Sequence, residues 1–209
     1  LYDKEVGRQV LNTAKYSGGD ILHFGYNGNG AGEFVRITPV NYEGYESLSM
    51  KSRQWKLVSA SELSSVFEAE ASMSNFTVIQ RVIVYHQVKK IDVEYDIPDW
   101  PGIHNRQIRA VFPLAMDVAQ VTYDVPMGIV NVGKDELNMA PRGWSWEGTY
   151  RQMPREIHPR EIENFVSASN NDFGFTMSTN LAVADWIDPG RESVDYPVLQ
   201  GIMLSSHKS

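Results

Sequence analysis

The chain has 209 residues and a mass of 23.6 kDa, which is enough for one large domain or two small ones with a full hydrophobic core. With 42% apolar and 22% charged residues, the composition is that of a globular protein, and no apolar run reaches the roughly 18 residues of a membrane span. The net charge of −7 disfavours nucleic acid or a membrane as partner, and the absence of cysteine excludes disulfides and thiolate chemistry.

The opening residues Leu1–Glu5 contain neither an initiator methionine nor a signal segment, so the sequence predicts a fragment of a longer protein. Its cellular compartment stays open between secreted or periplasmic and cytoplasmic. Further along, apolar residues recur with a period of two, as in Phe67, Ala69, Ala71 and Met73, which indicates half-buried strands. The clearest alternation predicts strands covering 66–73, 77–97, 107–112 and 118–125. Shorter candidates lie at 7–12, 19–24, 33–38, 53–59, 173–178 and 197–205.

Helical periodicity is weak throughout the chain. The nearest candidate is Arg155–Glu163, where Pro159 limits a helix to about one turn. Turn sequences such as Ser17–Asp20 separate the strands, and the Asn/Gly cluster at 27–32 favours a hairpin over a phosphate loop because no helix pattern follows it. We therefore predict an all-β fold, an antiparallel sandwich or barrel formed by residues 1–209 as one domain.

One long segment, 132–165, lacks strand periodicity and contains the best candidate contact residues. Trp144, Trp146 and Tyr150 lie close together there, and aromatic side chains of this kind either stack on sugar rings or fill interfaces between domains. Both interpretations stay open. The polar candidates for the same carbohydrate or interdomain contact are Arg151, Arg155 and His158, although a solvated turn is the plainer interpretation of His158.

Outside this segment, few residues of the sequence suggest catalysis or ligand binding. The five histidines show no metal-binding spacing, and there is no nucleophile elbow, so we assign no catalytic residue and no metal ligand. His86, in the valine-rich strand, is interpreted as structural, and His104 as an exposed loop residue. Acids stand beside indoles at Asp185–Trp186 and Asp99–Trp100, a pattern that suits sugar binding but is more typical of packing plus a turn.

Several segments, in order, resemble the C-terminal β-domain of the glycoside hydrolase family 38 α-mannosidases, each motif being weak alone. The segments that carry the resemblance are Leu1–Lys4 with Gly7-Arg8, Tyr95-Asp96-x-x-Asp99-Trp100, Phe112-Pro113, Tyr123-Asp124-Val125-Pro126-x-Gly128, Arg155–Pro159, Asp172-Phe173-Gly174, Pro197–Leu199 and Leu204–Ser209. The sequence departs from the family at Phe165, where many members have Trp, and at His207, where many have Arg. Members usually continue past the position of Ser209, and two interpretations stay open: part of the sandwich is lacking, or its remainder lies outside residues 1–209.

What the resemblance implies is a galactose-mutarotase-like β-sandwich that packs on an N-terminal catalytic domain of a retaining α-mannosidase. The nucleophile, the acid/base and a zinc ion of these enzymes belong to that catalytic domain, whose motifs are absent from residues 1–209, so no cofactor is expected in this chain. The implied partners are the enzyme's own catalytic domain and mannose-containing glycans. Two alternatives remain: an autonomous carbohydrate-binding module, and a mutarotase-like enzyme that would need His86 or His104 beside a glutamate.

Overall fold

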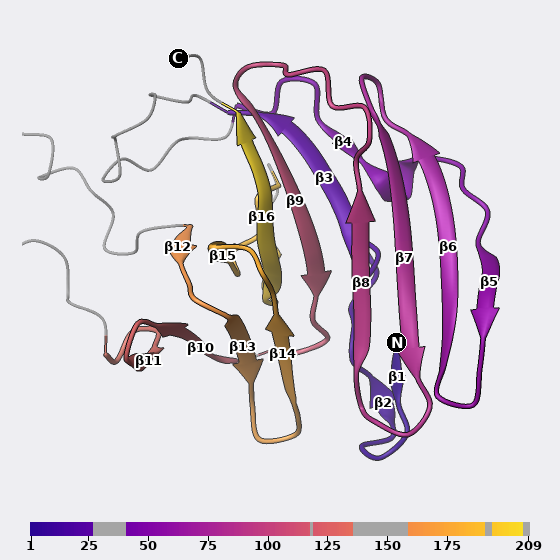
Figure 1. Ribbon diagram of the computed structural model, residues 1–209. Helices are drawn as coiled ribbons and strands as arrows, with labels where there is room; N and C mark the ends of the chain where they lie inside the picture. The colour runs from indigo at the N-terminus through magenta and orange to yellow at the C-terminus, as the bar shows by residue number, and fades with distance from the viewer. Residues whose placement is uncertain (27–40, 118, 136–158, 191–193, 207–209) are drawn as a thin grey trace, which may run out of the picture.

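The computed structural model describes residues 1–26, 41–117, 119–135, 159–190 and 194–206 (Figure 1). Regular structure in these ranges consists of β-strands and one short 3-10 turn, η1 (Leu48–Met50), and every strand pair is antiparallel. The predicted all-β class is therefore confirmed. The alternation of apolar and polar residues dictates it, because a period of two gives a strand one face to bury.

The largest sheet has six strands in the order β12-β15-β16-β9-β3-β4. Its strands are β12 (Arg160–Glu161), β15 (Val183–Asp185), β16 (Val198–Ser206), β9 (Arg106–Pro113), β3 (Asp20–Gly25) and β4 (Glu46–Ser47). The long strands β16 and β9 pair over most of their length, with one register shift between Ile202 and Leu204. β3 and β9 are buried along nearly their whole length, so this sheet is the centre of the molecule.

Two four-stranded sheets and one short hairpin complete the fold. The first four-stranded sheet contains β5 (Lys56–Ala60), β6 (Ser64–Ser72), β7 (Thr77–Tyr85) and β8 (Ile91–Asp96) in sequence order. The second follows the order β11-β10-β13-β14, with β10 (Gln120–Val125), β11 (Gly128–Asn131), β13 (Phe165–Ser169) and β14 (Gly174–Ser178). The hairpin pairs β1 (Tyr2–Asp3) with β2 (Arg8–Gln9).

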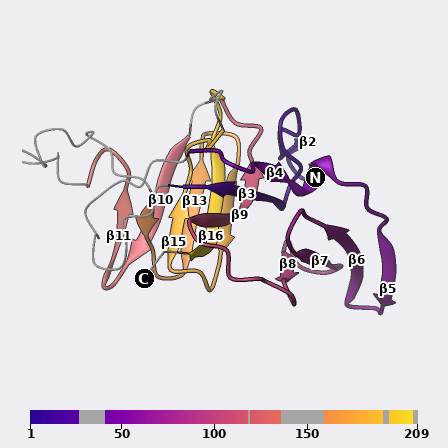
Figure 2. The same cartoon turned by 90° about the horizontal axis from the view of Figure 1, so that it is seen from above.

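Both four-stranded sheets pack on the same face of the central sheet. Ile108 and Ala110 on β9 contribute to a core cluster with Ala71 and Val78 of the β5–β8 sheet. Two residues further along the same face, Phe112 packs into a second cluster that contains residues of the β10–β14 sheet. The result is a β-sandwich, with the central sheet as one layer and the two smaller sheets as the other (Figures 1 and 2).

The turn at 17–20 connects the central sheet to the β5–β8 sheet and requires glycine at one position. Gly19 has a φ of +70°, and a side chain there would come within 3.0 Å of both Gln80 Nε2 and Tyr95 Oη. The Gly19 carbonyl accepts hydrogen bonds from Gln80 Nε2 at 2.7 Å and Tyr95 Oη at 2.9 Å. The buried Gln80 and half-buried Tyr95 side chains of the β5–β8 sheet thus hold the backbone oxygen that directly precedes β3.

A single carboxylate joins β10 to the start of β13. Asp124 Oδ1 accepts from the backbone N–H groups of Asn164 and Phe165, both at 2.8 Å, and Asp124 Oδ2 accepts from Asn164 Nδ2 at 2.8 Å. Burial opposes ionisation of Asp124, but these hydrogen bonds outweigh it and hold the pKa of the carboxyl below its usual range. The acid of the Tyr123–Gly128 segment is therefore structural.

Several sequence predictions need correction. The predicted stretch 77–97 is divided into β7 and β8 by a turn at 86–90, in which Val88 is 56% exposed. Arg160 and Glu161 pair with β15 as a strand, so the second half of the candidate helical turn is not helical. Strands β11, β13 and β15 were not predicted, because each has at most 5 residues, too few for a period of two to stand out. The candidate strand 33–38 lies outside the described residues.

Candidate functional site: a buried polar network on the central sheet

All six candidate contact residues named from the sequence lie in the segment 136–158, outside the described residues; these are Trp144, Trp146, Tyr150, Arg151, Arg155 and His158. Their proposed contacts remain predictions. The described polar groups with the most unusual surroundings lie instead on the central sheet, on the face opposite the two smaller sheets.

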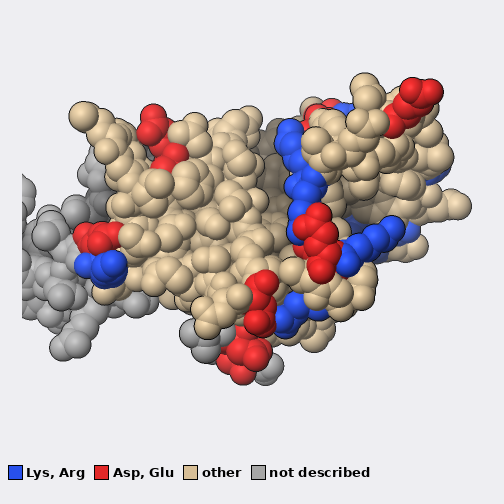
Figure 3. All heavy atoms as spheres, turned by 90° about the horizontal axis from the view of Figure 1, so that it is seen from below, with Lys and Arg blue, Asp and Glu red and all other residues tan. Residues whose placement is uncertain are grey.

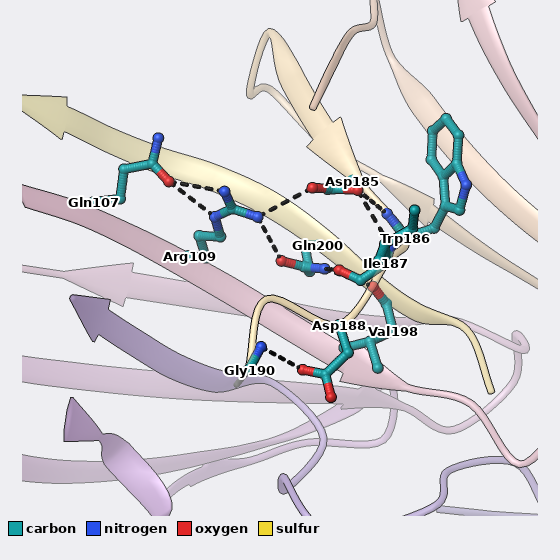
Figure 4. A network of polar contacts seen from close by, with 9 residues as sticks. All are labelled: Gln107, Arg109, Asp185, Trp186, Ile187, Asp188, Gly190, Val198 and Gln200. Carbon is teal, nitrogen blue, oxygen red and sulfur yellow. Dashed lines mark hydrogen bonds and ion pairs between the residues drawn. The ribbon is translucent and has the colours of Figure 1, made fainter. Parts of the chain in front are cut away.

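Arg109 is the centre of this network (Figure 4). It lies in the middle of β9, with a side chain that is only 5% exposed, and it makes its hydrogen bonds to three neighbours on the same face. Its Nη1 donates to Asp185 Oδ2 at 3.1 Å and to Gln200 Oε1 at 2.9 Å, while Nε and Nη2 donate to Gln107 Oε1 at 3.1 and 2.8 Å. Adjacent strands β9, β16 and β15 therefore converge on one guanidinium group.

The partners of Arg109 are themselves held by the backbone. Asp185 Oδ1 accepts from the N–H groups of Trp186 at 2.8 Å and Ile187 at 3.2 Å, which closes a turn at the end of β15. Gln200 Nε2 donates to the carbonyls of Ile187 and Val198. Burial lowers the pKa of the Arg109 guanidinium, and the Asp185 carboxylate opposes that shift. A buried cation is tolerated here because its charge and its donors are paired.

A second carboxylate lies a few residues further along the same chain segment. The Asp188 side chain is fully buried, and it accepts from Lys15 Nζ at 2.5 Å, Tyr16 Oη at 2.6 Å and the Gly190 N–H at 2.8 Å. Burial raises the pKa of Tyr16, and the hydrogen bond to Asp188 raises it further. Tyr16 therefore keeps its proton and acts as a donor that fixes this loop to the chain before β3.

Aromatic rings complete this face. The Arg109 guanidinium lies 5.3 Å from the centre of the Phe24 ring, and Phe24 stacks on Tyr45 with 6.5 Å between ring centres. The network has a charged, buried pair and neighbouring rings, but it holds no nucleophile with an adjacent base. Chemically it can fix backbone segments and present amide and hydroxyl groups. It does not by itself form a hydrolytic centre.

The histidines proposed as donors for a mutarotase-like reaction lie in exposed turns. His86 follows β7 by one residue, outside the strand in which the sequence placed it, and its ring nitrogens lie 2.9 Å from Ser65 Oγ and 3.1 Å from the Glu62 carbonyl. His104 is exposed, as predicted. The contacts of the His86 ring are thus with a serine hydroxyl and a backbone carbonyl.

The two acid–indole pairs serve packing and turns, the interpretation that the sequence favoured. Asp99 Oδ1 accepts from the Thr77 N–H at 2.7 Å, while Trp100 packs edge-on against Phe76 with ring centres 5.3 Å apart. Trp186 is 8% exposed and stacks on Tyr123 at 5.7 Å, beside the Asp185 turn. The Trp186 ring is therefore buried in the core, and the Trp100 ring is half-buried against Phe76.

Within the described ranges, no group of three or more His, Asp or Glu side chains has the geometry to hold a metal ion. Over the same residues, no helix is long and apolar enough to cross a membrane.

Sequence reasoning missed the Arg109 network entirely. One signal was present: Arg109 interrupts the apolar run of β9, and a charged residue within a buried strand is rare unless it has a partner. Its partners Asp185 and Gln200 are 76 and 91 residues away, so only the pairing of β9, β16 and β15 brings them together.

Comparison with known proteins gives a match in structure only. No protein-family model matches the sequence, and no curated protein matches it. Among solved structures, the fold is similar to part of an α-mannosidase from Enterococcus faecalis V583, with a TM-score of 0.68 and 13% identity over 99% of this chain and 23% of that one. A protein in glycosyl hydrolase family 38 from Enterococcus faecalis matches with a TM-score of 0.66 and 13% identity, over 99% of this chain and 24% of its own. The present chain thus spans about a quarter of each.

Proposed function

We propose that residues 1–209 form one non-catalytic β-domain of a retaining α-mannosidase, which packs on the catalytic domain of that enzyme. The observation that carries the proposal is the match of 99% of this chain to part of two family 38 proteins at TM-scores of 0.68 and 0.66. The described residues agree with a supporting role, because their buried charges are used in structural pairs. Zinc, in this proposal, belongs to the catalytic domain.

Trp144, Trp146, Tyr150, Arg151, Arg155 and His158 keep the role that the sequence suggested, contact with the catalytic domain or with a mannose-containing glycan. Two indoles within three residues would stabilise such a contact, and the arginines can donate hydrogen bonds to carboxylates or sugar hydroxyls. The segment that contains them connects the described residue Asp135, after β11, to β12 at the edge of the central sheet.

The experiment compares the 209-residue chain alone with the same chain mixed with the separately produced catalytic domain of its enzyme. Alone, the chain should not hydrolyse an aryl α-mannoside, with or without added zinc. Mixed, it should bind the catalytic domain and raise its activity. Turnover by the chain alone that disappears on replacement of one Asp or Glu would contradict the proposal. Binding of mannosides by the chain alone, without effect on any catalytic domain, would favour the carbohydrate-binding module instead.

A further inference from the structure

The two faces of the β5–β8 sheet have opposite character. The strand register assigns each residue to a face, because directly paired residues in antiparallel strands lie on the same side. The outer face carries all the acidic and basic side chains of the paired positions in β6, β7 and β8, mixed with Val66, Ile79, Ile83 and Tyr85; the charged residues are Glu68, Glu70, Arg81, Asp92, Glu94 and Asp96. The inner face carries the apolar side chains Leu57, Phe67, Ala69, Ala71, Val78, Val82, Val84, Ile91 and Val93.

The β7–β8 turn contacts the β1–β2 hairpin through Lys89, which pairs with Asp3 and Glu5, while the opposite end of the inner face is covered by the central sheet. There Ala71 and Val78 are buried against Ile21 and Ile108 of the central sheet. In the middle of the sheet, the hydrogen bonds from Gln80 and Tyr95 to the Gly19 carbonyl mark where this cover ends. Beyond that line, the inner face continues through the pairs Phe67–Val82 and Val84–Ile91.

The apolar surface of the other end is exposed. Leu57 is 58% and Ile91 38% exposed, and the turns at the same end add Leu63 at 66% and Val88 at 56%. β5 is the outermost strand in both ribbon views and is exposed along its whole length (Figures 1 and 2). In Figure 3, which faces the end where the β5–β6 and β7–β8 turns lie, charged side chains are confined to a few clusters on a largely uncharged surface. We call Leu57, Leu63, Phe67, Val84, Val88 and Ile91 the β5–β8 apolar surface.

We infer that the β5–β8 apolar surface is the docking surface for the catalytic domain, an inference that rests on the function proposed above. The paired positions of the inner face contain no acidic or basic residue, and an apolar sheet face of this kind is suited to be covered by another domain. In the two similar mannosidase structures, this fold accounts for 23% and 24% of one chain, so more than three quarters of each chain lies outside the match and can supply the cover. Interfaces that form permanently are more apolar than transient ones, as this surface is.

The test uses three variants of the 209-residue chain and its affinity for the separately produced catalytic domain. Leu57→Asp places a charge in the surface, and Leu63→Asp does so at the adjacent turn. The control is Ile129→Asp, because Ile129 is an apolar residue of similar exposure, 62%, which also lies on an edge strand, β11. Since all three side chains are largely exposed in the chain alone, the variants should fold, and circular dichroism and thermal melting verify this. Sedimentation velocity measures both affinity and self-association.

We expect Leu57→Asp and Leu63→Asp each to weaken binding at least about tenfold, and Ile129→Asp to change it less than about twofold. If all three variants bind as the unmodified chain does, docking uses another surface and the inference is wrong, although the proposed function stands. Equal weakening by all three variants also overturns it. A dimer of the chain that Leu57→Asp dissociates would identify a second copy as the occupant. If the unmodified chain neither binds nor activates the catalytic domain, the proposed function itself fails.

Discussion

Removing the charge of Asp185 tests whether the Arg109 network holds the central sheet together. Asp185→Asn keeps the size of the side chain and leaves one amide oxygen to accept from the Trp186 and Ile187 N–H groups. It removes the only carboxylate that the described contacts place on Arg109. The Arg109 guanidinium, with its side chain 5% exposed, is then a buried charge without a counter-ion.

The expected cost follows from that burial. Breaking a buried ion pair on one side typically costs about 3–5 kcal/mol, because the remaining charge cannot be hydrated. Arg109 retains its hydrogen bonds to Gln107 and Gln200, so we place Asp185→Asn near the lower limit, at about 3 kcal/mol. Against a total stability of roughly 5–15 kcal/mol this is a large loss. Arg109→Met should cost a similar amount, since the buried Asp185 carboxylate loses the guanidinium that donates to it at 3.1 Å.

The double variant Arg109→Met with Asp185→Asn tests whether the destabilisation comes from an unpaired buried charge or from altered side-chain packing. With both charges gone, only the Gln107 and Gln200 side-chain oxygens lose a donor and the charges of the pair are both removed, so we expect a total cost of about 1–2 kcal/mol, well below the sum of the single changes. Urea unfolding followed by tryptophan fluorescence measures the free energy of unfolding, and an unchanged m-value shows that the transition stays comparable.

The control pair is Arg8 and Asp172, which are 2.6 Å apart with side chains 40% and 62% exposed. Asp172→Asn should cost less than about 1 kcal/mol, because water screens this pair. Two results would refute the reasoning about Arg109. One is a cost of Asp185→Asn no larger than that of Asp172→Asn. The other is a double variant whose cost equals the sum of the single costs.

Two further predictions concern how the stability of the fold depends on pH. Asp124→Ala should lower the free energy of unfolding by about 2–3 kcal/mol at neutral pH, since the Asn164 and Phe165 N–H groups lose the carboxylate that accepts from them. The folded-state pKa of Asp124 is depressed, so its contribution is complete above the ordinary value of 3.8 and is lost as the pH falls through the folded pKa. Thermal melting of both proteins should therefore converge below that pKa. His23 is 1% exposed, and neither ring nitrogen makes a hydrogen bond within the described part of the chain. Burial lowers the pKa of His23, and the nearby Glu46 carboxylate opposes this shift. The contribution of neutral His23 to stability is therefore complete above pH 6.5 and is lost as the pH falls below that value. His23→Phe should therefore flatten the decline of the melting temperature between about pH 7.5 and 5, and an equally steep decline in both proteins would show that His23 does not titrate there.

Motifs that the sequence shows only as separate segments meet in the folded chain. Gly7-Arg8 and Asp172-Phe173-Gly174 are 164 residues apart, yet Arg8 pairs with Asp172 and lies 5.2 Å from the centre of the Phe173 ring. Asp124 of the Tyr123–Gly128 segment holds the start of β13. These contacts give a physical reason for the segments to occur together in one chain.

The sequence by itself determined the all-β class and the position of the long strands, because the period of two is a local property that needs no knowledge of partners. Residues 66–73 and 107–112, for example, were predicted as strands and correspond to β6 and β9. The turn at 17–20 was equally readable, since glycine supplies its positive φ.

Tertiary structure alone decided which strands pair, and with that the polar network and the exposed apolar surface. Arg109 meets Asp185 and Gln200 only because β16 lies between β9 and β15, and that order comes from long-range pairing and not from any local pattern. The alternation in β5–β8 predicts an apolar face, but not which half of it the central sheet covers. That depends on where β3 and β9 cross it, which the energies of packing between distant segments determine.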